Sequence, residues 1–270
     1  MTVDGRPGAT PKGANVSTFP SRPRFHGHRM YPRYVALTRA TSRLPGLTEW
    51  VLSLVGGLLQ DQTPSSSQDP TIEDVQTTSL VVCGVQRSGT TFLARAAEVL
   101  LNGTGRVWQS HDPFAPRDFL PHGIPVIVTL RDPLESAISK ATYHGDAVTS
   151  QSLCRRLDLV TTWFRLIAHE SPHPQLMTSE FEEFTVAPAA CLASLLGNEV
   201  LTSVSAKDVL TRVESIDTQQ RLDSSQTHIP HPDRLDRRSR FEELADDATV
   251  RRHLGRALEA MERVRQNHAV

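Results

Sequence analysis

Residues 80–101 constrain the fold more than any other part of the chain. They begin with the apolar run Leu80-Val81-Val82-Cys83, which predicts a buried strand. Gly84 and Gly89 then bracket a short loop, and an alanine-rich apolar run to Leu101 predicts a helix. A strand, a glycine-containing loop and a helix are the parts of a phosphate-binding site, because backbone amides at a helix N-terminus point at the anion where the helix dipole is positive. We therefore expect an anion site at the start of this helix.

The polar residues of the loop would add donors to these amides. Arg87 brings a planar cation, and Thr90 and Thr91 add hydroxyl groups. The two glycines have the spacing of a Walker A loop, but Thr90 stands where that loop has the lysine that reaches the β- and γ-phosphates. The sequence therefore favours an anion held without a triphosphate and without an obligatory metal. The alternative is a tight strand-to-helix turn that binds nothing.

Strands and helices are expected to alternate along the rest of the chain. Residues 106–110 and the β-branched run 126–130 predict two more strands, and the second has no polar face, so we expect it to be central and covered on both sides. A further strand is expected at Gln175-Leu176-Met177, and helices are expected at 134–143, 152–169, 187–196 and 241–267. This order predicts an α/β fold of three layers, with a mostly parallel central sheet flanked by helices and a ligand at the carboxyl ends of the strands.

The composition changes near residue 75. Residues 1 to about 30 are rich in Pro, Gly, Ser and basic side chains and predict a flexible arm. Residues 31–60 have a helical pattern, for which packing on the main domain, a contact in a homo-oligomer and association with a membrane surface are all open. Residues 61–78 have the composition of a linker. We therefore expect an N-terminal arm and linker over 1–75 and one main domain over 76–270.

Charge and composition exclude several classes of protein. The net charge of −1, with balanced signs, argues against a broad nucleic-acid-binding surface. The three cysteines lack metal-ligand spacing. The first 30 residues have no apolar core of a signal peptide. Neither feature indicates an oxidising compartment. The most apolar window, 50–59, is shorter than a bilayer requires. We expect a cytoplasmic protein with no transmembrane segment and no metal.

A second motif begins directly after the predicted strand 126–130. It reads Arg131-Asp132-Pro133-Leu134-Glu135-Ser136-Ala137-Ile138-Ser139. Together with residues 84–92 it resembles the P-loop sulfotransferases, which use 3′-phosphoadenosine 5′-phosphosulfate as donor. A weaker likeness is Glu180-Phe181-Glu182-Glu183-Phe184, followed by Pro188 and Leu195-Leu196-Gly197. The resemblance extends over about residues 78 to 200 and implies the P-loop form of the three-layer fold.

The resemblance implies a role for each matching residue. Arg87 is expected to contact the 5′-phosphosulfate and to offset charge on the bridging oxygen as the S–O bond breaks. Arg131 and Ser139 are expected to bind the 3′-phosphate; the alternatives are a surface ion pair and a serine on a helix face. The other residues expected to contact the donor are Ser88, Gly89, Thr90, Thr91 and Phe92, with Phe181 offering an apolar surface to the nucleotide.

The general base is expected just after the second strand. Many members of the family have a histidine there in a lysine-x-histidine arrangement, and this chain has Gln109-Ser110-His111. His111 is therefore our candidate base, since histidine accepts a proton near neutral pH. Asp112 is the rival candidate, and a third possibility is that neither takes part. Gln109 brings no charge, so a second cation for the transition state is not identified.

The resemblance implies transfer of a sulfuryl group to a hydroxyl or amine of a small-molecule, glycan or lipid acceptor. Two alternatives remain: a P-loop kinase of a small molecule with Asp132 as a magnesium ligand, and a non-catalytic nucleotide-binding module. The segment between Ser139 and Phe181 is expected to line the acceptor site. The basic segment 228–238 either covers the nucleotide or is a solvated linker.

Overall fold

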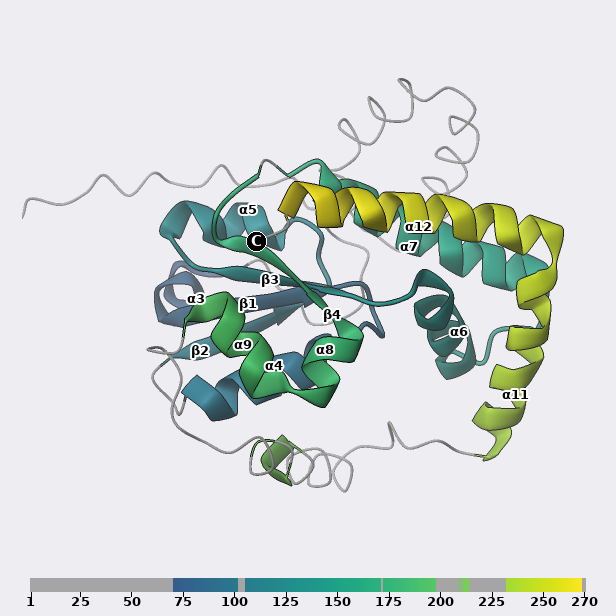
Figure 1. Ribbon diagram of the computed structural model, residues 1–270, viewed down its shortest axis with the longest axis horizontal. Helices are drawn as coiled ribbons and strands as arrows, with labels where there is room; N and C mark the ends of the chain where they lie inside the picture. Colours follow the sequence, from purple (N-terminus) through teal and green to yellow (C-terminus); the bar gives the residue numbers. More distant parts are fainter. Residues whose placement is uncertain are drawn as a thin grey trace, which may run out of the picture.

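The computed structural model describes residues 70–101, 105–170, 172–197, 209, 211–213 and 232–268. The predicted arm, the helical segment at 31–60 and the first half of the predicted linker, 61–69, lie outside these residues. The described part is an α/β fold with one four-stranded sheet (Figure 1). No helix within it is long and apolar enough to cross a membrane.

All four strands are parallel and lie in the order β2-β1-β3-β4. The two central strands, β1 (Thr78–Gly84) and β3 (Val126–Leu130), pair with Val81 opposite Val126 and Gly84 opposite Thr129. The outer strands are β2 (Arg106–Ser110) and β4 (Leu176–Glu180). The predicted strands at 80–83, 106–110 and 126–130 are confirmed, as is the parallel sheet; β4 runs further along the chain than predicted.

Helices cover both faces of the sheet (Figure 1). One face carries α4 (Thr90–Leu101), α8 (Phe181–Val186) and α9 (Pro188–Leu196), and the other carries α5 (Ala115–Phe119), α7 (Ser150–Ala168) and α12 (Ala248–His268). α6 (Pro133–Tyr143) and α11 (Pro232–Glu243) lie beyond the carboxyl ends of the central strands. The remaining short helices are α3 (Ile72–Thr77), η3 (Leu120–His122) and η5 (Leu244–Asp246). This is the three-layer arrangement that the order of elements predicted.

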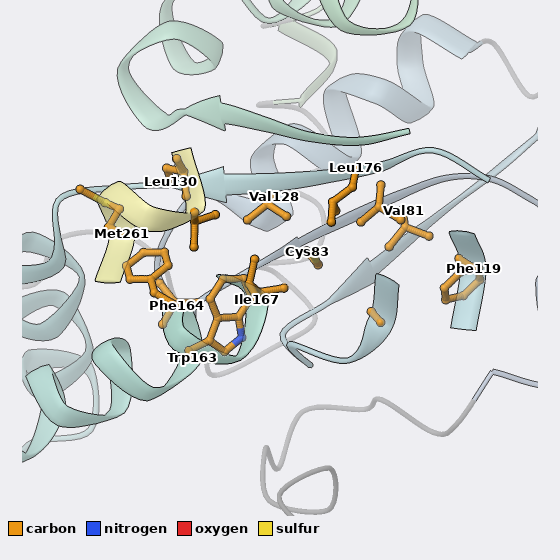
Figure 2. Close-up of a cluster of buried hydrophobic side chains, with 14 of the residues drawn as sticks. Val81, Cys83, Phe119, Val128, Leu130, Trp163, Phe164, Ile167, Leu176 and Met261 are labelled. Atoms are coloured by element: carbon orange, nitrogen blue, oxygen red, sulfur yellow. The ribbon is translucent and has the colours of Figure 1, made fainter. Parts of the chain in front are cut away.

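Alternation along the central strands divides the core between the two faces. Val81 and Cys83 of β1 pack with α5, α7 and α12, whereas Leu80 and Val82 pack with α4 and α9. Figure 2 shows the first cluster, in which Trp163 and Phe164 of α7 lie under Val128 and Cys83 of the sheet. Because both faces of β1 and β3 are covered, these strands need the continuous apolar runs seen in the sequence.

Three sequence-based expectations about elements are wrong. The helix expected over 241–267 is interrupted: α11 ends at Glu243, η5 follows, and α12 begins at Ala248. The carboxylate of Asp247 accepts hydrogen bonds from the amides of Thr249 (2.7 Å) and Val250 (3.2 Å) at the start of α12. The basic segment 228–238, for which a solvated linker was one alternative, is helical from Pro232, so that alternative is wrong for 232–238; residues 228–231 lie outside the described residues.

The linker expected over 61–78 contains the helix α3, so this expectation is wrong for residues 72–77. Thr71 and Asp74 form a capping box that starts this helix, and Val75 is buried in the first cluster. The spacing Thr71-x-x-Asp74 was the signal that could have predicted the helix. The short helices α5 and α8 were not predicted either.

Candidate functional site

Strand register brings three chain segments together at one edge of the sheet. Cys83 lies opposite Ser110, and Gly84 lies opposite Thr129. The residues that follow these positions therefore leave the sheet side by side at its carboxyl edge, where ligands of parallel sheets bind. They are the loop 85–89, which we call the glycine loop, His111 after β2, and Arg131 after β3.

Two glycines make the tight path of the glycine loop possible. A Cβ on Gly84 would lie 2.0 Å from Thr129 Oγ1 and 2.5 Å from Ser88 Oγ, so β1 and the loop meet here without space for a side chain. Gly89 has φ +81°, and a Cβ there would lie 2.8 Å from the rings of Phe181 and Phe184. Arg87 also has a positive φ of 75°, which is uncommon for a residue with a side chain and is typical of strained functional loops.

Ser88 stabilises the loop from inside. Its hydroxyl lies 2.7 Å from both Val85 O and Thr129 Oγ1, its amide donates to Val85 O at 3.1 Å, and its side chain is fully buried. Thr90 is also buried, with its hydroxyl 3.3 Å from Ser88 Oγ. Both hydroxyl groups thus already have partners within the protein.

Backbone amides remain as donors to an anion. The amides at the N-terminus of α4, which begins at Thr90, have no intrahelical acceptor, and those of Gly89, Thr90, Thr91 and Phe92 donate to no other residue of the described chain. The side chain of Thr91 accepts a hydrogen bond of 2.7 Å from Gln109 Nε2. These amides surround the positive end of the helix dipole, and the arrangement suits a phosphate or sulfate group.

Arg87 links the glycine loop to α6. Its Nε donates to Ser139 Oγ at 3.0 Å, and its guanidinium lies 5.2 Å from the ring centre of Tyr143 one turn further along α6. The two sequence motifs are therefore in direct contact through the two residues to which we assigned the two ends of the donor.

Arg131 connects the same parts through a different set of contacts. Its Nη1 donates to Arg87 O at 2.8 Å, its Nη2 lies 3.4 Å from Glu135 Oε2, and its guanidinium lies 4.3 Å from the ring centre of Phe181. Burial lowers the pKa of Arg131, which remains charged because the guanidinium is so basic. A guanidinium has more N–H donors than these bonds use, so Arg131 can still bind an anion.

Arg238 of α11 joins this group from far along the chain. Its Nη2 lies 2.5 Å from Glu135 Oε2, so Glu135 stands between two arginines. The neighbouring Arg237 donates to Asp146 O at 2.9 Å. The described part of the basic segment thus lies against α6, next to Arg131. This packing could not be predicted from the sequence, which gives no partner for either arginine.

The aromatic residues lie under the glycine loop. Phe92 stacks on Phe184 with ring centres 6.3 Å apart, and Phe181 meets Phe184 edge to face at 5.6 Å. Phe184 is fully buried, whereas Phe92 and Phe181 are partly buried at the margin of the second core cluster. Since Arg131 covers the ring of Phe181, the flat surface expected to meet a nucleotide is in contact with a cation.

His111 is oriented by the end of β1. Its Nδ1 lies 2.8 Å from Gly84 O, and its own carbonyl accepts a hydrogen bond of 2.8 Å from Trp163 Nε1. A carbonyl oxygen only accepts, so the proton of neutral His111 is on Nδ1 and Nε2 carries the lone pair. Burial lowers the pKa of His111, and the positive charges of Lys140 and Arg87 lower it further. His111 is therefore neutral at pH 7 and able to accept a proton at Nε2.

The two aspartates considered for other roles act as helix and turn caps. Asp112 Oδ1 accepts a hydrogen bond of 2.9 Å from the amide of Phe114 before α5. Asp132 is the N-cap of α6 and accepts one of 2.9 Å from the amide of Glu135. Among residues 70–101, 105–170, 172–197, 209, 211–213 and 232–268, no group of three or more potential ligands is positioned to hold a metal ion. The contacts of Asp112 and Asp132 favour structural roles for both.

The structure brings together Arg87, Arg131, Ser139 and His111 and adds Lys140, which sequence reasoning missed. Neighbouring residues of a helix point about 100° apart, so the motif that contains Ser139 gave no signal for Lys140. No protein-family model matches the chain, and no curated protein or solved structure is significantly similar to it.

Proposed function

We propose that this protein transfers a sulfuryl group from 3′-phosphoadenosine 5′-phosphosulfate to a hydroxyl or amine of a small-molecule, glycan or lipid acceptor. The observation that carries the proposal is the contact between Arg87 and Ser139, which joins the loop after β1 to the helix after β3. Two anion-binding segments that touch suit one ligand with two separate anionic groups. The sequence resemblance supplies the identity of that ligand. A cytoplasmic location belongs to the proposal and rests on the cysteine pattern.

In this proposal the donor is held at both ends. The amides of Gly89, Thr90, Thr91 and Phe92 and the guanidinium of Arg87 bind the 5′-phosphosulfate. Arg131 and the O–H of Ser139 bind the 3′-phosphate; Ser139 can do so because its oxygen accepts from Arg87 while its proton remains available. Ser88 supports the loop, because its buried hydroxyl is bonded to Val85 O and Thr129 Oγ1 and does not point at the donor in this proposal.

The reaction is a displacement at sulfur. The acceptor oxygen or nitrogen forms a bond to sulfur, the bridging S–O bond breaks, and its electron pair stays on the phosphate oxygen of 3′-phosphoadenosine 5′-phosphate. His111 Nε2 takes the proton that the acceptor loses, and Arg87 offsets the charge on the bridging oxygen. The proposal includes no metal, since Arg87 carries the compensating charge.

A transfer assay with donor labelled in the sulfuryl group tests the reaction. Acceptor libraries of phenols, alcohols, amines, glycans and lipid headgroups are incubated with the protein, and products are separated by mass. We expect one acceptor class to gain label with the wild type and not with Arg87→Ala. If the bisphosphate nucleotide binds but no class gains label, the binding-module alternative holds; phosphoryl transfer from ATP–magnesium would instead identify a kinase.

A further inference from the structure

One face of α6 is turned toward the glycine loop. Ser139 and Tyr143 on this face contact Arg87. At the helical period of 100° per residue, Ser136 and Lys140 lie on the same side of the helix. The hydroxyl of Ser136 is buried and has no hydrogen-bond partner in the described part of the chain. This face therefore carries one buried hydroxyl, that of Ser136, that no described residue satisfies.

Lys140 is the charged member of this face. Its side chain is partly buried, and no carboxylate of the described residues forms an ion pair with it. Burial and the positive charges of Arg156 and Arg87 lower its pKa to about 8, so it is mostly protonated at pH 7. Asp146 is the carboxylate whose charge raises the pKa of Lys140. Both of its oxygens are bound by Arg156, at 2.7 and 2.9 Å. A partly buried ammonium among other cations is costly unless an anion binds beside it.

The positive charge of Lys140 also acts on the candidate base, His111. This charge lowers the pKa of His111, with a larger effect there than the charge of Arg87. The ammonium of Lys140 thus interacts electrostatically with both residues of the proposed reaction. These are Arg87, at the leaving oxygen, and His111, at the acceptor.

We propose that Lys140 binds the sulfuryl oxygens of the donor and is the second cation of the transfer reaction. This inference rests on the proposed function. As the bridging S–O bond breaks and the bond to the acceptor forms, Lys140 keeps its proton and contacts the oxygens of the group in transit. Arg87 faces the leaving oxygen, and His111 receives the acceptor proton. Lys140 would then supply the positive charge that Gln109, whose amide is bonded to Thr91, does not bring.

Two nucleotides that differ only by the sulfuryl group test this role. Calorimetric titration compares the sulfated donor with 3′-phosphoadenosine 5′-phosphate on the wild type, on Lys140→Met, and on Arg155→Ala as a control that removes an exposed cation from α7. Lys140→Met should weaken binding of the donor about ten- to a hundredfold, the scale of a charge-assisted hydrogen bond, and change binding of the bisphosphate less than about twofold. Arg155→Ala should change neither.

Equal losses for the two nucleotides, or no loss for either, would overturn the role of Lys140 while leaving the proposed function in place. A wild type that binds neither nucleotide would overturn both. A second measurement uses the unaltered protein and does not depend on the variant folding: acylation of the Lys140 amine, followed by mass spectrometry, should be slowed by saturating donor much more than by saturating bisphosphate. Equal protection by the two would contradict the inference.

Discussion

Arg87 Nε donates a hydrogen bond of 3.0 Å to Ser139 Oγ, although the two residues are 52 positions apart in the chain. The contact forms because β1 and β3 are neighbours in the sheet and both segments leave it at the carboxyl edge. Arg131 strengthens the junction by donating to Arg87 O at 2.8 Å. We propose that this junction binds the two anionic ends of one nucleotide.

Removing the guanidinium of Arg131 should distinguish its two contacts. Arg131→Ala is expected to weaken binding of 3′-phosphoadenosine 5′-phosphate by about 1.5–3 kcal/mol, the scale of a hydrogen bond to a charged group. Adenosine 5′-phosphate, which lacks the 3′-phosphate, should lose far less, as calorimetric titration of both ligands would show. Equal losses would mean that Arg131 acts by holding the glycine loop through Arg87 O and does not read the 3′-phosphate.

Replacing His111 should separate catalysis from binding. His111→Asn keeps a side-chain donor that can reach Gly84 O but has no usable base, so donor affinity should change little while turnover falls by about 10²–10⁴-fold. His111→Ala should be similarly inactive. Steady-state kinetics and titration of the same variants check both parts.

Asp112 provides the matched comparison for that variant. Because Asp112 caps the amide of Phe114, Asp112→Ala should lower the free energy of unfolding by about 1 kcal/mol and leave most of the turnover. Loss of turnover in Asp112→Ala with normal turnover in His111→Ala would move the role of base to the carboxylate.

The dependence of the rate on pH follows from the environment of His111. The base must be neutral, so the rate should rise with pH through the pKa of His111. Burial and the charges of Lys140 and Arg87 lower that pKa, which places the midpoint of the rise below the ordinary value of about 6.5. Lys140→Met removes one of these charges and should move the midpoint to higher pH. A midpoint above 6.5 in the wild type would contradict this assignment.

Two glycines with the same backbone conformation should differ in how they tolerate alanine. Gly89 and Gly123 have φ +81° and +74°, but only at Gly89 would a Cβ meet other atoms, 2.8 Å from Phe181 and Phe184. Gly123→Ala should therefore lower the free energy of unfolding by about 1–2 kcal/mol, the cost of a left-handed conformation. Gly89→Ala should cost about 1–3 kcal/mol more for the overlap. Equal shifts in denaturant midpoint would show that the rings move aside.

Local sequence patterns were sufficient where the chain itself determines the structure. The glycine loop and β3 were predicted because glycine spacing and a continuous apolar run are signals within a few residues. The break at Asp247 was missed because the apolar period continues across it, although an aspartate before Thr249 is itself a capping signal.

Contacts between distant segments could not be predicted in this way. The inward hydroxyl of Ser88 depends on Thr129 in another strand, and Glu135 meets Arg238 only because α11 packs beside α6. Lys140 gave no motif, and its environment depends on Arg87, Arg156 and His111 from three other segments. The sequence motifs named Arg87, Arg131, Ser139 and His111 as candidates, and the pairing of strands determines how these residues meet.

The most direct measurement of the central claim is nucleotide binding without metal. The thermal midpoint of the full chain is measured in a chelator with saturating 3′-phosphoadenosine 5′-phosphate, and separately with ATP plus magnesium. Ligand that binds only the folded state adds about 2.7 kcal/mol to the free energy of unfolding at a hundredfold excess over Kd. The thermal midpoint rises as a consequence. We predict a clear rise with the bisphosphate nucleotide in the wild type and a smaller one in Arg131→Ala. A rise with ATP–magnesium and none with the bisphosphate nucleotide would contradict the account.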